Sequence, residues 1–156
     1  MIHSQIAPRL EHVLFYILEK SIKSYRQFAQ RNLKKVNKDI TIDQWLILKT
    51  IHDNPNISQR EIAEAIFKDV ASVTRMIELL VSKGFLLRSS HSEDRRRHGL
   101  KLTPMGNITQ EDLMPVIIQN RSIALEGLSE KEIETLRNLL QKIILNCTNS
   151  QNQKSK

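Results

Sequence analysis

The stretch that decides the fold is EIAEAIFKDVASVTRMIELLVSKGFLLRSSHSEDRRRHGLKLTPMG, residues 61–106. It opens with a short helical pattern that ends near Phe67, and a second helix starts after the capping residue Asp69 and stops at Gly84. Two short helices joined by so few residues predict a helix-turn-helix. After Gly84, the β-compatible runs FLLRSS and HGLKLT flank the arginine-rich connection HSEDRRR, so a two-stranded hairpin is expected to follow.

Helices are expected on both sides of this stretch. Apolar residues recur at three- and four-residue spacing over residues 8–35, where Pro8 suits the first turn of a helix. The starts of three further helices are predicted by capping pairs, which are Thr41 with Gln44, Ser58 with Glu61, and Ser129 with Glu132. Pro104 begins another long helix, which Pro115 should kink or break.

The predicted fold class is mainly α with a small β-hairpin wing, a winged helix-turn-helix core flanked by N- and C-terminal dimerisation helices. We expect one domain over residues 1–148, with the helix-turn-helix lobe at 41–103 and the dimerisation helices at 8–35 and 104–148. The terminal helices carry broad apolar stripes that a monomer of this size has too little core to cover, which favours a homodimer. Residues 149–156 have no apolar face to bury and should form a disordered tail.

Composition restricts the partners. The chain has 156 residues, a formal net charge of +7 and an isoelectric point near 9.7, which favours nucleic acid or an anionic membrane surface as a partner. The single cysteine, Cys147, excludes an intrachain disulfide framework and fits a reducing cytosol. The N-terminal stretch lacks the pattern of a signal peptide, and no apolar run is long enough to predict a membrane-spanning helix.

The second helix of the pair carries the candidates for base recognition. Arg75 lies on its polar face, where a guanidinium fork could reach O6 and N7 of guanine. Ser72 and Thr74 lie nearer the start of the helix and could contact a base edge or a phosphate. Further candidates for phosphate contacts are Ser58 and Gln59 at the start of the short helix and Lys68 in the turn. The alternative for each of these side chains is an ordinary solvated surface.

The connection of the hairpin is the strongest electrostatic feature of the chain. It carries three adjacent arginines, Arg95, Arg96 and Arg97, after an acidic pair that ends in Asp94. At least one arginine is expected to enter a minor groove while others bind phosphate, and a solvated turn is the alternative. Asp94 is expected to brace the tip by accepting hydrogen bonds from an arginine or from amides of the turn.

These residues together resemble the winged-helix core of MarR-type regulators, the multiple-antibiotic-resistance-regulator family. The resemblance is carried by Asp94-Arg95-Arg96, Leu102-Thr103 and Gly106, together with Val73-Thr74-Arg75 and Lys83-Gly84 upstream. It implies a homodimer whose first and last helices interleave, with Ser72, Thr74 and Arg75 in the major groove and Arg95 or Arg96 at the wing. Family members are commonly repressors that a small, often aromatic or phenolic, ligand releases. The turn at Phe67-Lys68 departs from the family, which often has a small residue there.

An effector is expected in the apolar crevice between the dimerisation helices and the DNA-binding lobe. Tyr16, Trp45 and Met114 could line it, and their alternative is a plain role in the core. Cys147 is expected to be a buried dimer residue rather than a redox sensor. The histidines show no metal-site spacing and no catalytic motif is present, so we expect no metal, no cofactor and no enzymatic activity.

The sequence therefore predicts a regulator of transcription in the bacterial cytosol, most simply a repressor. It would act as a homodimer that binds a pseudo-palindromic operator in double-stranded DNA. Two alternatives stay open, a winged-helix protein-interaction module and a nonspecific nucleoid-binding protein. A steep salt dependence separates DNA binding from the first, and a preference for one sequence separates it from the second.

Overall fold

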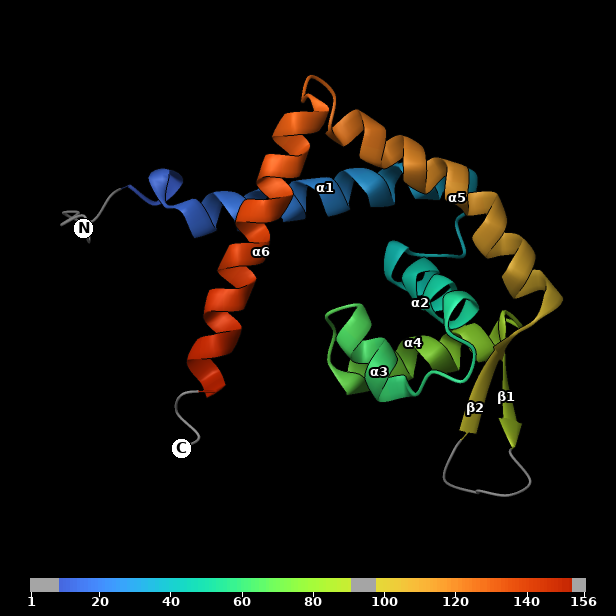
Figure 1. The fold of residues 1–156 in the computed structure, drawn as a ribbon. Coiled ribbons are helices and arrows are strands. Elements are labelled where there is room, and N and C mark those ends of the chain that lie inside the picture. The colour runs from blue at the N-terminus through green and yellow to red at the C-terminus, as the bar shows by residue number, and fades with distance from the viewer. Residues whose placement is uncertain (1–8, 91–97, 153–156) are drawn as a thin grey trace. The chain divides into compact units, whose positions relative to one another are not determined.

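The computed structural model describes residues 9–90 and 98–152, and it shows the predicted order of elements (Figure 1). The elements are η1 Leu10–His12, α1 Leu14–Val36, α2 Ile42–Asp53, α3 Gln59–Ala65, α4 Val70–Ser82, β1 Leu86–Ser90, β2 His98–Leu102, α5 Pro104–Ala124 and α6 Glu130–Asn152. The chain forms two compact units, residues 1–120 and residues 121–156. The first unit holds the helix-turn-helix and the hairpin, which confirms the predicted winged-helix fold class.

The first long helix starts later than predicted. Leu10–His12 form a separate 3-10 turn, and Val13 is extended, with φ −78° and ψ 121°. The Val13 N–H donates to the Leu10 carbonyl at 3.0 Å, which closes the short turn instead of continuing into α1. The prediction of one helix from Pro8 is therefore wrong at this end, and Pro8 itself lies outside the described residues.

The three predicted capping pairs are confirmed. The Thr41 hydroxyl accepts from the Gln44 N–H at 3.2 Å while the Gln44 side chain accepts from the Thr41 N–H at 3.0 Å. The same reciprocal bonds join Ser58 to Glu61 and Ser129 to Glu132. Since each pair satisfies amide groups that a helix start leaves free, the sequence alone located these three boundaries within a residue.

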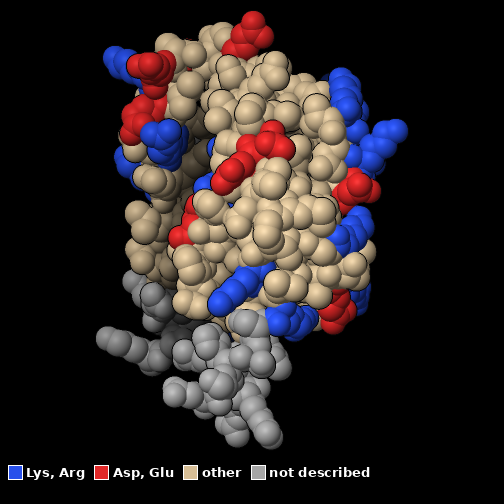
Figure 2. Space-filling view, turned by 90° about the vertical axis from the view of Figure 1, so that its right-hand side faces the viewer, with Lys and Arg blue, Asp and Glu red and all other residues tan. Residues whose placement is uncertain are grey.

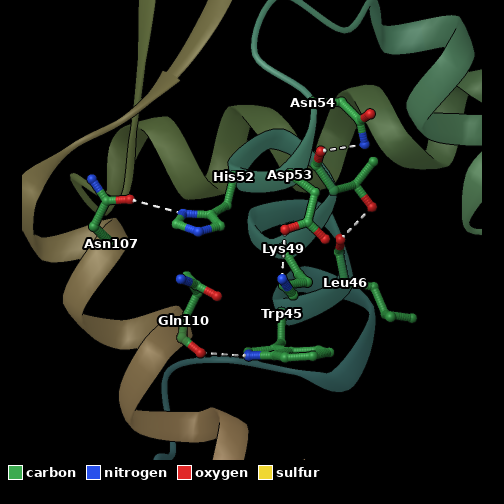
Figure 3. Close-up of polar contacts among 9 residues, drawn as sticks. Trp45, Leu46, Lys49, His52, Asp53, Asn54, Asn107 and Gln110 are labelled. Atoms are coloured by element: carbon green, nitrogen blue, oxygen red, sulfur yellow. Dashed lines mark hydrogen bonds and ion pairs between the residues drawn. The ribbon is translucent and has the colours of Figure 1, made fainter.

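The core of the first unit lies between α2, α4 and the hairpin, and α5 closes it. Trp45 is only 2% exposed, and its Nε1–H donates to the Gln110 carbonyl of α5 at 3.1 Å (Figure 3). The other fully buried members include Ile47, Leu48, Ile62, Val73, Ile77, Leu80 and Leu86. This packing fixes α4 against the rest of the lobe, since Val73, Ile77 and Leu80 along its inner face are fully buried.

The hairpin is joined to α5 by a tight backbone contact. β1 and β2 are antiparallel, with Leu86 opposite Leu102 and Arg88 opposite Leu100. The Thr103 N–H donates to the Phe85 carbonyl at 3.1 Å, and the Thr103 hydroxyl accepts from the Gly106 N–H at 3.0 Å. The first turn of α5 therefore lies directly against the chain that enters β1.

The two last helices were predicted to have a kink or break at Pro115 and a disordered tail after residue 148. α5 is not broken at Pro115, and Figure 1 shows it curved but uninterrupted, so of the two predicted outcomes only the break is wrong. α6 continues through Asn152, so residues 149–152 are helical and the predicted disordered tail is wrong for them. In these last turns the Ser150 hydroxyl donates to the Asn146 carbonyl at 2.8 Å, a bond within the helix that does not itself explain the extension. Residues 153–156 lie outside the described part of the chain.

Candidate nucleic-acid interface

The start of α4 is capped by its own chain. Asp69 accepts from the Ser72 N–H at 2.8 Å and from the Ser72 hydroxyl at 2.7 Å. These hydrogen bonds from Ser72, with a smaller contribution from the charge of Arg75, hold the pKa of Asp69 below its usual range. The carboxylate thus occupies the positive end of α4, which leaves the recognition of DNA to side chains rather than to the helix terminus.

The hydroxyl protons of Ser72 and Thr74 are both engaged inside the protein. Ser72 donates to Asp69, and Thr74 donates to the Val70 carbonyl at 2.8 Å. Each oxygen keeps lone pairs that can accept, for example from the amino group of adenine or cytosine. In this arrangement the two hydroxyls suit base edges better than phosphate oxygens, which only accept.

Arg75 lies one turn further along α4 and is exposed. Among the described residues its guanidinium makes no hydrogen bond and no ion pair. It can therefore extend its fork without breaking an existing contact, which agrees with the predicted role in base recognition. Val73 and Ile77, on either side of it in the sequence, are fully buried and hold the helix face in place.

The start of α3 lies beside α4. Gln59 and Thr74 approach with 3.5 Å between the amide oxygen and the hydroxyl, so the structure brings these two predicted residues together. Ser58 is engaged in the cap with Glu61, and the neighbouring Arg60 pairs with Glu64 at 3.2 Å. A phosphate contact at the start of α3 would therefore have to be made by the backbone N–H groups that the cap leaves free and by the Gln59 side chain.

The turn between α3 and α4 places Lys68 and Phe67 in unexpected surroundings. The Lys68 ammonium lies 3.3 Å from the Asp43 carboxylate at the start of α2, where the sequence predicted only a phosphate contact. Phe67 adopts a left-handed backbone with φ 57°, and its side chain is 93% exposed. The Phe67 and Lys68 N–H groups donate to the Glu64 and Ala63 carbonyls, which completes a Schellman turn around a residue that is usually glycine.

This turn gives a stability prediction. Replacing Phe67 by glycine should stabilise the protein by about 1 kcal/mol, because a side chain at this backbone conformation is strained and the exposed ring has no packing to lose. Denaturant melts measure the change in the free energy of unfolding. Phe67→Ala is the matched control and should leave stability near that of the wild type, since alanine keeps the strain. A glycine variant no more stable than the alanine variant would contradict the account.

The wing extends the candidate surface beyond the predicted residues. Asp94, Arg95, Arg96 and Arg97 lie outside the described residues, so their roles stay predictions. The two strands carry exposed cations, Arg88 and Lys101, which were not predicted from the sequence as part of the interface. Figure 2 looks onto this side of the molecule and shows Lys and Arg side chains toward its lower edge. The register places Arg88 opposite Leu100 and Lys101 opposite Leu87, so the two cations lie on opposite faces of the hairpin.

The three predicted effector residues lie in different surroundings. Trp45 is a core residue bonded to Gln110, Met114 packs against the same core, and Tyr16 lies on α1 with 38% exposure. The neighbouring polar contact joins His52 to Asn107 at 3.4 Å (Figure 3). Burial of the indole favours the plain core role that was the alternative for Trp45.

A different hollow opens between α1 and α2 and has a volume of about 420 Å³. Its lining consists of Arg26, Gln27, Gln30, Arg31, Ile42 and Asp43. The Gln30 side-chain oxygen accepts from the Ile42 N–H at 2.9 Å, and its amide nitrogen is buried without a partner among the described residues. An unpaired buried donor beside arginines suits a ligand that carries an acceptor or a negative charge.

Within residues 9–90 and 98–152, no group of His, Cys, Asp or Glu side chains could hold a metal ion. In the same part of the chain, no helix is both long and apolar enough to cross a membrane. Cys147 is exposed on α6.

The arrangement of α3, α4 and the β1–β2 hairpin defines a winged helix-turn-helix domain. The sequence model of the MarR family matches residues 40–98, which span α2, both helices of the motif and the hairpin as far as the start of β2. Residues 40–98 are therefore similar to the MarR family of transcriptional regulators, whose members are regulators and not enzymes.

Solved structures resemble the chain over most of its length. MarR of E. coli in its reduced form is 26% identical, with a TM-score of 0.69, over 89% of this chain and 98% of that chain. BpsR of Bordetella bronchiseptica, whose DNA binding is regulated by 6-hydroxynicotinic acid, is 23% identical, with a TM-score of 0.78, over 89% and 99%. A mutant MarR of E. coli in complex with operator DNA is 23% identical, with a TM-score of 0.77, over 88% and 99%. The last two show the shared fold.

Proposed function

We propose that this protein is a repressor that binds a specific sequence in double-stranded DNA and acts in the bacterial cytosol. The observation that carries the proposal is Arg75, exposed on α4 and without a partner among the described residues, on a helix whose other face is buried. Arg75 reads a guanine through a bidentate contact, and Ser72 and Thr74 accept from neighbouring base edges. The operator-bound E. coli relative supports this use of the fold.

The working form is a homodimer. On α1, Leu14, Phe15 and Ile22 are between 55% and 61% exposed, although each is large and apolar. On α6, Leu139, Ile144 and Leu145 are between 52% and 62% exposed. Exposed apolar faces of this kind are usually buried against a partner, and a second copy of the chain related by two-fold symmetry would bury them. Such a dimer reads a pseudo-palindrome whose half-sites lie one helical turn apart, about 34 to 36 Å.

A small-molecule effector releases the DNA. Support comes from BpsR, whose DNA binding responds to 6-hydroxynicotinic acid, and from the hollow between α1 and α2 with its unpaired Gln30 amide. A tenfold release requires about 1.4 kcal/mol of coupling between effector and DNA. Titrating the operator complex with 6-hydroxynicotinic acid as a probe, against nicotinamide as a neutral analogue, measures that coupling.

Selection of bound sequences from a random duplex pool tests the proposal as a whole. At near-physiological salt, the purified protein should enrich a pseudo-palindrome with half-sites about ten base pairs apart, and sedimentation should show a dimer. Binding with a steep salt dependence but no enriched sequence would instead indicate a nonspecific nucleoid-binding protein. A folded dimer that binds no DNA would indicate a protein-interaction module.

The wing gives a second prediction about DNA. Arg95→Ala and Arg96→Ala should each weaken operator binding and lower the slope of log affinity against log salt by about one, because each removes a contact to the DNA backbone or minor groove. Fluorescence anisotropy over a salt series measures both quantities. Lys23→Ala on α1 removes the same charge outside the lobe and serves as the control. Unchanged affinity and slope in both arginine variants would remove the wing from the interface.

A further inference from the structure

Asp43 lies between two cations that come from distant parts of the chain. One of its carboxylate oxygens pairs with Arg26 of α1, and the other lies 3.3 Å from the ammonium of Lys68 in the turn before α4. The side chains of Arg26, Asp43 and Lys68 are 38%, 23% and 35% exposed, so water screens the two ion pairs only in part. Asp43 also occupies the first turn of α2, where the helix dipole favours a negative charge.

The position of Lys68 controls where α4 begins. Its own N–H donates to the Ala63 carbonyl at 3.0 Å, and the next residue is the capping Asp69. Phe67, on its other side, projects into solvent and contributes no packing to this turn. The ion pair with Asp43 therefore supplies a side-chain tie between the turn and α2, and through Arg26 it reaches α1.

We propose that Asp43 is a positioning residue for DNA recognition, which holds Lys68 and thereby sets the first turn of α4 relative to α1. The inference rests on the proposed function, because it assumes that α4 reads DNA. In this proposal the Lys68 ammonium pairs with Asp43 inside the protein and does not contact a DNA phosphate. A side chain that reads a base must be placed within a fraction of an ångström. An ion pair that fixes the helix carrying Ser72 and Arg75 should therefore affect the preference for one DNA sequence more than the general affinity for DNA.

The direction in which Asp43→Asn changes DNA affinity distinguishes the positioning role from a simple effect of charge. Asp43→Asn removes a negative charge from a DNA-binding lobe, and charge alone would make binding to every duplex tighter. The positioning role predicts the opposite on the operator, a loss of about fivefold or more, with little loss on random duplex. Glu64→Gln on α3 is the matched control, since it removes an exposed carboxylate from the same lobe, and it should bind the operator as tightly as the wild type or tighter.

Lys68→Met tests the other end of the tie. A positioning lysine predicts weaker operator binding with an unchanged salt slope, whereas a phosphate contact predicts a slope lower by about one. In a double-mutant cycle with Asp43→Asn, the double variant should lose little more than either single variant, because both remove the same interaction. Asp43→Glu, which keeps the charge, should restore most of the operator affinity. Additive losses with a reduced slope would overturn the proposal, as would an Asp43→Asn variant that binds the operator normally.

Amide hydrogen exchange gives a readout that does not depend on DNA. If Asp43 holds the turn, the amides of residues 68–72 should exchange faster in Asp43→Asn than in the wild type, while the core of α4 near Ile77 stays protected. Unchanged exchange at 68–72 would overturn the tie even if the protein proved to be a sequence-specific regulator. Faster exchange in a protein without sequence preference would keep the tie and reject the proposed function. Circular dichroism and thermal melts establish that the variants are folded.

Discussion

Gly106→Ala is expected to destabilise the first unit by about 3 kcal/mol or more and to abolish operator binding. A Cβ atom at this position would lie 2.1 Å from the Phe85 carbonyl oxygen and 3.2 Å from a methyl group of Leu102. The nearer atom belongs to the backbone, which cannot rotate away. Either the first turn of α5 or the chain entering β1 must therefore move, although hydrogen bonds through Thr103 join them.

Denaturant melts of Gly106→Ala give the loss in the free energy of unfolding. Gly127→Ala is the comparison, because nothing lies within 4 Å of its added Cβ and only its left-handed backbone, with φ 83°, is strained. It should lose about 1 kcal/mol. If Gly106→Ala proved as mild as Gly127→Ala, the close approach of α5 to the hairpin would be wrong.

Arg75→Ala is expected to lower the affinity for the selected operator by about 1 to 3 kcal/mol and to relax the preference at one base pair in each half-site. The reason is the loss of a bidentate contact to guanine, while the exposed position on α4 leaves the fold intact. Binding to a panel of operators, each changed at one base pair, measures both effects. Thermal melts should show little change in stability, since Arg75 makes no hydrogen bond or ion pair among the described residues and its charge contributes least to the lowered pKa of Asp69.

Arg75→Lys is the matched variant for this prediction, because it keeps the charge but not the fork. It should recover affinity for random duplex and still lose most of the preference at the same base pair. A loss that is equal on the operator and on random duplex in Arg75→Ala, and restored by lysine, would instead assign Arg75 to a phosphate. The base readout would then have to come from Ser72 and Thr74.

Features written in local sequence were predicted well. The capping pairs at Thr41, Ser58 and Ser129 and the cap at Asp69 are bonds between residues three apart, so a short window contains both partners. The two places where the helix ends were misplaced lack such a pair. Val13 caps α1 without a side-chain bond, and the last turns of α6 carry only hydroxyl-to-carbonyl bonds such as that of Ser150.

In the predicted site, too, the features that depend on local sequence were predicted and those that depend on distant segments were not. The face of α4 that carries Arg75 follows from helical periodicity and is exposed as expected, whereas the surroundings of Trp45, Lys68 and Phe67 depend on segments far away in the chain. Trp45 is bonded to Gln110, which lies 65 residues later in the sequence. No local pattern could show that this indole is covered by α5 rather than open to a ligand.

The sequence by itself determined the order of the helices, the helix-turn-helix, the hairpin and the basic character of the surface. Each of these rests on periodicity, capping or composition, which are properties of neighbouring residues. Only the tertiary structure decided that Lys68 meets Asp43, that Gly106 must lack a side chain, and that the hollow lies between α1 and α2. The physical reason is that these are contacts between elements, whose distances are set by the packing of the whole core and not by any one stretch of chain.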